Sequence, residues 1–117
     1  MSEKVYEFLD WIRPVSTVHV AGEKQVFLSE VDTESNITQF AYGRFAPGEG
    51  CEEHSHQTME ECFFFIRGYG VYKVENELID IKPNTFFRIR PDIRHYIKNT
   101  GDSNLEFIYF GVAIEKI

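Results

Sequence analysis

The chain has few cysteines, little positive charge and no long hydrophobic run. Two cysteines in 117 residues exclude the disulfide framework that stabilises many small secreted domains. Twelve Lys and Arg stand against 19 Asp and Glu, a formal net charge of −7 that argues against a nucleic-acid partner. No apolar run approaches the roughly 18 residues of a membrane span, and no basic-then-apolar leader opens the chain. We therefore expect a cytoplasmic protein with neither a nucleic-acid nor a membrane partner.

The composition is that of an ordinary folded domain. Hydrophobic residues make up 43% of the chain and charged residues 26%, which is typical of globular proteins and not of disordered ones. Domains most often run about 100–150 residues. We therefore expect residues 1–117 to form one domain, with no linker or repeat.

Helical periodicity is confined to the N-terminus. Val5, Phe8, Leu9 and Ile12 recur at i, i+3, i+4 and i+7, and Pro14 would end the helix. Residues 1–14 are thus predicted to form a short helical arm. The rest of the chain shows short alternating or apolar runs separated by turn residues, including a hairpin of 18–20 with 25–28. About eight such strands predict an all-β barrel or sandwich.

The run 62–66, Cys-Phe-Phe-Phe-Ile, is apolar on both faces of a single strand. One face of a single-layer sheet open to water should be polar, so the outer face must be covered. Either the N-terminal helix or a second subunit can cover it. We expect a homodimer.

Three of the four histidines have a spacing typical of metal ligands. His54 and His56 are two residues apart, so both imidazoles project from one face of a strand. Glu61 opens the next strand, and His95 lies on a later one. Such a set can bind Mn, Fe, Co, Ni or Zn. The pair His54 and His56 alone is a weak signal, because surface or core histidines have the same spacing.

The residues around these four form two longer motifs. The first, residues 48–68, reads Gly48-x5-His54-x-His56-x4-Glu61-x6-Gly68 and closely resembles the first motif of the cupin superfamily. The second, residues 84–99, reads Asn84-x5-Arg90-x-Asp92-x2-His95-x3-Asn99 and is similar to the second cupin motif.

The second motif departs from the cupin pattern at three positions, none of them a ligand. Asn84 and Asp92 replace glycines, and Arg90 replaces a proline. Asn and Asp are the residues other than glycine that best tolerate a left-handed backbone, so both substitutions are compatible with tight turns. Pro91 can still stiffen the turn beside Arg90.

The resemblance implies a double-stranded β-helix, the jelly-roll barrel of cupins, with one divalent transition metal bound by His54, His56, Glu61 and His95. Glu60 is the rival carboxylate, but the spacing to Gly68 runs from Glu61. Cys51 is a second rival, as a soft ligand three residues before His54. Some cupins have lost the metal, so a metal-free barrel is a further alternative.

Four protein ligands on an octahedral ion leave two positions for water or a substrate with two adjacent oxygens. The resemblance therefore implies an enzyme acting on a small oxygen-rich substrate, a sugar or a keto or hydroxy acid. Isomerase or epimerase and dioxygenase are the reactions we expect. The alternatives are a metal-dependent sugar-binding module without turnover and a metal-free structural domain.

Catalytic residues other than the ligands are hard to select from the sequence. Tyr42 and Arg44 precede the first motif and can present polar groups to an anion, and Tyr96 flanks His95. The remaining histidine, His19, is expected to have no ligand role.

Overall fold

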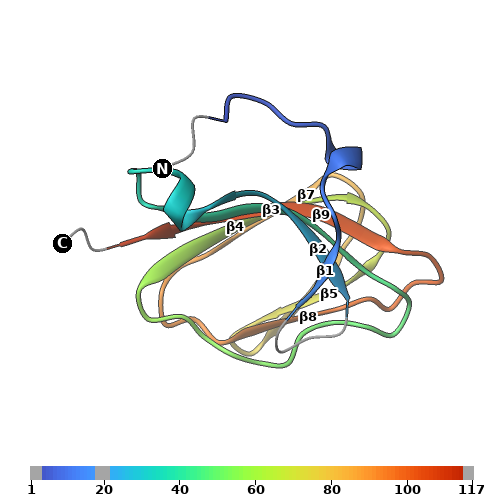
Figure 1. Ribbon diagram of the computed structural model, residues 1–117. Coiled ribbons are helices and arrows are strands. Elements are labelled where there is room, and N and C mark those ends of the chain that lie inside the picture. Colours follow the sequence, from blue (N-terminus) through green and yellow to red (C-terminus); the bar gives the residue numbers. More distant parts are fainter. Residues whose placement is uncertain (1–3, 18–21, 115–117) are drawn as a thin grey trace.

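Two antiparallel sheets face each other (Figure 1), and the buried side chains of the core are apolar. The computed structural model describes residues 4–17 and 22–114. The larger sheet has the strand order β1-β2-β3-β9-β4-β7, and the smaller one the order β6-β5-β8. The strands are β1 (Val15–Ser16), β2 (Glu23–Ser29), β3 (Ile37–Phe45), β4 (Met59–Arg67), β5 (Gly70–Val74), β6 (Glu77–Ile81), β7 (Thr85–Ile89), β8 (His95–Lys98) and β9 (Leu105–Ala113). The prediction of an all-β jelly roll is confirmed.

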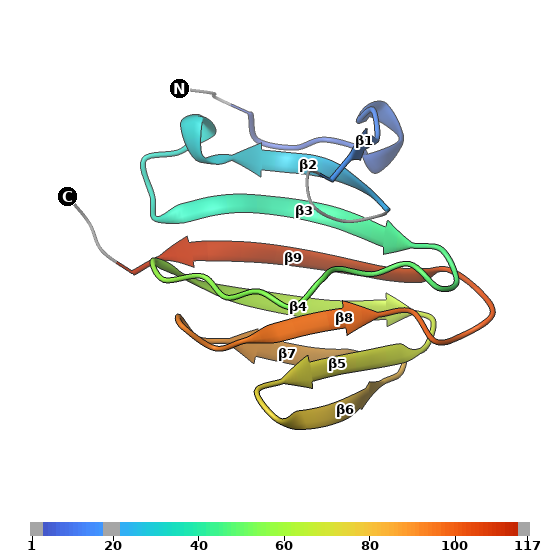
Figure 2. The same ribbon diagram turned by 90° about the horizontal axis from the view of Figure 1, so that it is seen from below.

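The core lies between the sheets and is rich in aromatic residues. Because successive strand residues point to opposite faces, Phe63 and Phe65 of β4 are buried, whereas Phe64 and Ile66 remain 37% and 41% exposed. Tyr72 of β5 packs edge-on against both buried rings. Figure 2 shows the smaller sheet lying across β4 and β7, while β1, β2 and β3 extend beyond it.

Two turns have the backbone that the second motif predicts. Asn84 and Asp92 have φ values of 69° and 68°, in the left-handed region. The amide of Asp92 donates to the carbonyl of His56 at 2.7 Å, which joins the two motifs. At the end of the second motif, the buried Asn99 donates to the carbonyls of Phe45 and Ser103, both at 2.9 Å.

Of the helix predicted for residues 1–14, the described residues 4–14 form only a short 3₁₀ turn, η1 (Leu9–Trp11), in place of an α-helix. The side-chain amide of Gln25 donates to the carbonyls of Leu9 and Ile12 at 3.0 and 2.9 Å. The predicted apolar stripe is not buried, since Val5 is 93% exposed. A helix this short needs a well-buried apolar stripe to be stable, whereas Leu9 and Ile12 are only half-buried.

The predicted hairpin of 18–20 with 25–28 falls partly on residues 18–21, outside the described part of the chain. Residues 25–28 are in β2 as expected, and β2 pairs with β1 through Val15 opposite Lys24. A second 3₁₀ turn, η2 (Glu30–Asp32), follows β2. In the described residues, no helix has the length and apolar content needed to cross a bilayer.

Candidate metal centre

Backbone hydrogen bonds hold two of the candidate histidines next to each other. His54 and His56 lie on the segment between β3 and β4, and His95 begins β8. His54 and His95 form an isolated antiparallel bridge, with hydrogen bonds of 3.0 Å from His54 N to His95 O and 2.9 Å in return. Glu61 comes from β4, in the opposite sheet. The site thus joins both sheets.

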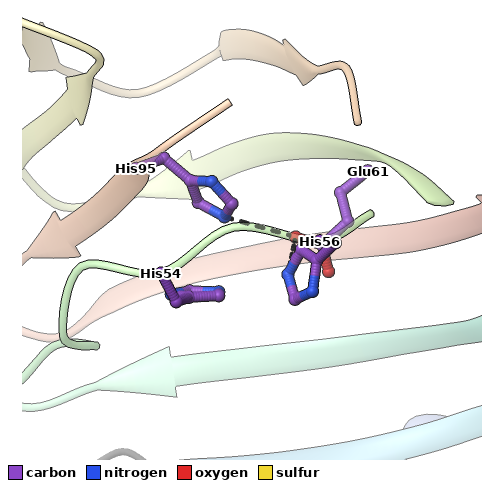
Figure 3. A group of neighbouring side chains, drawn as sticks. All are labelled: His54, His56, Glu61 and His95. Carbon is purple, nitrogen blue, oxygen red and sulfur yellow. Dashed lines mark ion pairs between the residues drawn. The ribbon is translucent and has the colours of Figure 1, made fainter. Parts of the chain in front are cut away.

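The structure brings all four predicted ligands together. One donor atom from each of His54, His56, Glu61 and His95 lies within 4.8 Å of the others. His56 Nε2 is 3.2 Å from Glu61 Oε1, and His95 Nε2 is 3.6 Å from the same oxygen. Figure 3 shows both histidines directed at the carboxylate, with His54 beside them.

Backbone carbonyls determine the tautomers of two of the imidazoles. His54 Nδ1 lies 2.8 Å from Glu52 O, and His95 Nδ1 lies 2.8 Å from Ile93 O. A carbonyl only accepts, so each Nδ1 carries the proton. A neutral ring then has its lone pair on Nε2, the arrangement found in metal-binding histidines.

The electrostatics favour ligand-competent protonation states at Glu61 and His54. Burial alone would raise the pKa of the Glu61 carboxyl, but His56 and His95 outweigh it and lower that pKa to about 2. The carboxylate is therefore ionised at neutral pH. Burial lowers the pKa of His54, which keeps its ring neutral. The Glu61 carboxylate, 3.2 Å from His56 Nε2, raises the pKa of His56, so a proton competes with a metal ion for this ring.

The four residues fit a divalent cation. The Nε2 atoms of His56 and His95 are buried, and in the described residues neither has a hydrogen-bond partner of good geometry. In a neutral His95 ring, the Nε2 lone pair faces the Glu61 carboxylate, so two acceptors oppose each other. A cation between them relieves this repulsion, and N and O donors are those that first-row divalent ions accept.

The cluster lines a cavity of about 200 Å³. Much of its wall is apolar, with aromatic rings from β3, β4 and β9: Phe45, Phe63, Phe107 and Tyr109. A cavity of this volume accommodates a small organic ligand.

The two rival ligands lie apart from the cluster. Glu60 points out of the barrel and pairs with Arg88 at 2.7 Å. Cys51 lines the cavity, but its Sγ accepts a hydrogen bond from Ile97 N at 3.3 Å, and it is not part of the four-residue group.

The other three candidates point away from the cavity. Tyr42 and Arg44 alternate with the inward-facing Phe45 on β3; Tyr42 donates to Glu106, and Arg44 pairs with Glu23 at 2.7 Å. Tyr96 alternates with the buried His95 on β8 and lies beneath the Lys73 ammonium. His19 falls outside the described residues.

The polar residues that line the cavity beside the ligands were not selected from the sequence. Among them, Lys24, Gln39 and Tyr109 come from the neighbouring strands β2, β3 and β9, of which β9 is far from the other two in sequence. Strand parity is the signal that finds Gln39, because it shares the inward face with Ala41 and Phe45.

Several solved structures resemble this one. A predicted oxalate decarboxylase from Thermotoga maritima superposes with a TM-score of 0.89 and 22% identity, covering 94% of this chain and 100% of that protein. KdgF from Halomonas sp. gives a TM-score of 0.76 and 10% identity, with coverage of 97% and 96%. The cupin domain of Cnp3 from Schizosaccharomyces pombe gives 0.71 and 14%, with coverage of 83% and 69%. At these identities the likeness establishes the fold.

Sequence comparison identifies the family. An uncharacterized protein of Methanocaldococcus jannaschii is 31% identical over 55 residues, which are 47% of this chain and 44% of that protein. The chain therefore spans less than half the length of this curated relative. The sequence profile of the cupin domain matches residues 41–111, more than half of the chain and all four residues of the cluster. The chain belongs to the cupin family.

Proposed function

We propose that this cupin is a metal-dependent enzyme acting on a small carboxylic acid with a keto or hydroxyl oxygen next to the carboxylate. The reaction is an isomerisation or epimerisation, or a dioxygenation. The observation that carries the proposal is the convergence of three imidazoles and one ionised carboxylate, within 4.8 Å of one another, on a cavity.

Each residue of the site has a definable role in such an enzyme. His54, His56, Glu61 and His95 would hold the ion, and the carbonyls of Glu52 and Ile93 would keep two of the rings in the binding tautomer. A bound divalent ion supplies Lewis-acid polarisation and coordination positions for two substrate oxygens. The aromatic wall excludes water from the reacting groups.

The cavity favours a small acid over a sugar. A sugar presents hydroxyl groups all around its ring and needs as many polar partners, whereas Phe45, Phe63 and Phe107 offer none. The similarity to a predicted oxalate decarboxylase supports a small carboxylate as well.

A binding module without turnover is the second candidate. In the described residues, the cavity lining holds no carboxylate besides the ligand Glu61 and the rim residue Glu23, which pairs with Arg44. Such a lining offers no second carboxylate as a general base, a feature that favours the module. A sugar ligand, however, fits its apolar wall poorly.

The first experiment is elemental analysis of protein purified without an affinity metal. We expect about one transition-metal ion per chain in the wild type and none in His56→Ala. Iron would direct the next assay to oxygen consumption, and Mn, Ni or Zn to isomerase and lyase substrates. A wild type that stays metal-free after reconstitution would refute the proposal. If metal-loaded protein converts none of the acids or sugars tested, that result would favour the binding module.

A further inference from the structure

A chain of hydrogen bonds crosses three strands on the cavity wall. Lys24 Nζ donates to Gln39 Oε1 at 2.8 Å, and Gln39 Nε2 donates to the hydroxyl oxygen of Tyr109 at 3.3 Å. All three residues line the cavity that holds the metal cluster. The Tyr109 ring is fixed by stacking on Phe63, with centroids 5.0 Å apart and planes 5° apart.

The direction of this chain follows from the chemistry of its first member. An ammonium group only donates, so the Gln39 atom that it contacts must be the amide oxygen. The amide nitrogen is then the atom facing Tyr109, and it too only donates. The Tyr109 oxygen therefore accepts, and its own proton has to be donated elsewhere. In the described part of the chain, no protein acceptor for that proton is found.

The same wall also carries positive charge. Lys24 has three N–H groups and uses one of them on Gln39. Across residues 4–17 and 22–114, no carboxylate forms an ion pair with Lys24. Its neighbour Glu23 pairs with Arg44 instead. The cavity thus presents an ammonium group and a hydroxyl donor, both available to a ligand.

We propose that Lys24, Gln39 and Tyr109 form a specificity arm that binds a second carboxylate of the substrate, while the first chelates the metal. This inference rests on the proposed function, since it assigns the far end of the ligand held at the cluster. The substrate class is then a short dicarboxylic acid with a hydroxyl or keto oxygen beside one carboxylate. Gln39 is a positioning residue, because it sets the direction of the Tyr109 hydroxyl.

The test compares two ligands that share a chelating end. L-malate and (S)-2-hydroxybutyrate both have a hydroxyl beside a carboxylate, but malate has a second carboxylate where the other acid has a methyl group. Calorimetry on metal-loaded wild type should show malate binding at least about tenfold more tightly, the size expected for charge-assisted hydrogen bonds. Tyr109→Phe and Lys24→Met should each reduce this preference severalfold, with unchanged metal content and unchanged 2-hydroxybutyrate affinity.

A further variant and a matched control make the result specific. Gln39→Glu keeps the shape of the side chain but places a negative charge in the arm, so malate should lose its advantage over 2-hydroxybutyrate. Tyr96→Phe and Lys73→Met remove the same groups from the outer face, where Lys73 lies 5.9 Å from the Tyr96 ring centroid, and should leave the preference intact.

The outcomes separate the two proposals. Equal binding of both acids to the metal-loaded wild type would overturn the specificity arm and leave the metal-dependent function standing. A preference for malate that survives Tyr109→Phe, Lys24→Met and Gln39→Glu would overturn the arm as well. If metal-loaded wild type binds neither acid, both the arm and chelation of small acids are wrong.

Discussion

The imidazoles of His54 and His95 lie with their ring centroids 4.3 Å apart, and the same two residues exchange both backbone hydrogen bonds of a β-bridge. The first cupin motif is thereby tied to the second at two of the candidate ligands. The distance between the two rings depends on backbone pairing, so it is set before any ion binds. Such preorganisation lowers the cost of binding a metal.

The two neighbouring glutamates of β4 give a matched test of the ligand assignment. Glu61→Gln removes the ionised oxygen that faces two histidines, and we expect the variant to lose stoichiometric metal. Glu60→Gln breaks only the outward pair with Arg88 and should keep one ion per chain. Elemental analysis after reconstitution measures both. If Glu60→Gln is metal-free and Glu61→Gln still binds one ion per chain, Glu60 and not Glu61 is the ligand.

Removing the metal should lower the stability of the fold. An ion present at 100 times its dissociation constant stabilises the native state by about 2.7 kcal/mol. In a domain of this size, about 1 kcal/mol shifts Tm by roughly 4–8 °C. Addition of EDTA should therefore lower Tm by about 10 °C or more in a thermal melt. The His56→Ala variant should show no such shift, and an equal shift there would indicate chelator effects unrelated to the site.

Tyr72 has a buried hydroxyl that finds no hydrogen-bond partner in the described part of the structure. A buried polar group without a partner costs about 1–3 kcal/mol. Tyr72→Phe should thus leave metal-free protein as stable as the wild type or about 1 kcal/mol more stable, as measured by urea unfolding. A loss of more than 1 kcal/mol would mean that the hydroxyl has a partner.

Titration of the Tyr42 hydroxyl should make the stability of the fold depend on alkaline pH. Partial burial and its hydrogen bond to Glu106 raise the Tyr42 pKa to about 12, above the ordinary value near 10. The unfolded chain thus loses this proton first. The contribution to stability is complete below pH 10 and disappears as pH rises toward 12. Urea unfolding from pH 9 to 11 should show a smaller loss for Tyr42→Phe than for wild type or for the exposed control Tyr69→Phe.

The homodimer remains a prediction, and the structure narrows where to test it. Phe64 of β4 is paired in register with Phe86 of β7, and Phe86 is 60% exposed on the outside of the barrel. We expect light scattering to give twice the chain mass at micromolar concentration and Phe86→Glu to give a monomer. If the wild type has the mass of one chain, the homodimer prediction is wrong and the face with Phe64 and Phe86 is not covered by a second copy.

Local patterns predicted the barrel and the grouping of the four candidate ligands, because both depend on spacing along the chain. Alternation in the strands and the two motifs were enough to expect Glu61 and His95 beside His54 and His56, and left-handed backbone was correctly expected at Asn84 and Asp92. The one-domain extent stays a prediction.

The features that could not be predicted from the sequence depend on contacts between segments that are distant along the chain. The N-terminal stripe has helical spacing, but Gln25 binds carbonyls in that segment instead. Arg67 should share the inward face with Phe65, yet an irregularity in the strand pairing between them leaves Arg67 exposed. Lys24 and Tyr109 become neighbours of Gln39 only through the strand order β2-β3-β9.

Glu61 belongs to the larger sheet and His95 to the smaller one, and the bridge to His54 attaches the first two histidines to the smaller sheet as well. A single carboxylate is therefore the larger sheet's contribution to a centre whose histidines are otherwise attached to β8. Transient separation of the two sheets at this edge would expose the ion on one side while three ligands stay in place. Amide exchange in β8 would then report how often the barrel opens, and metal exchange would share that same opening.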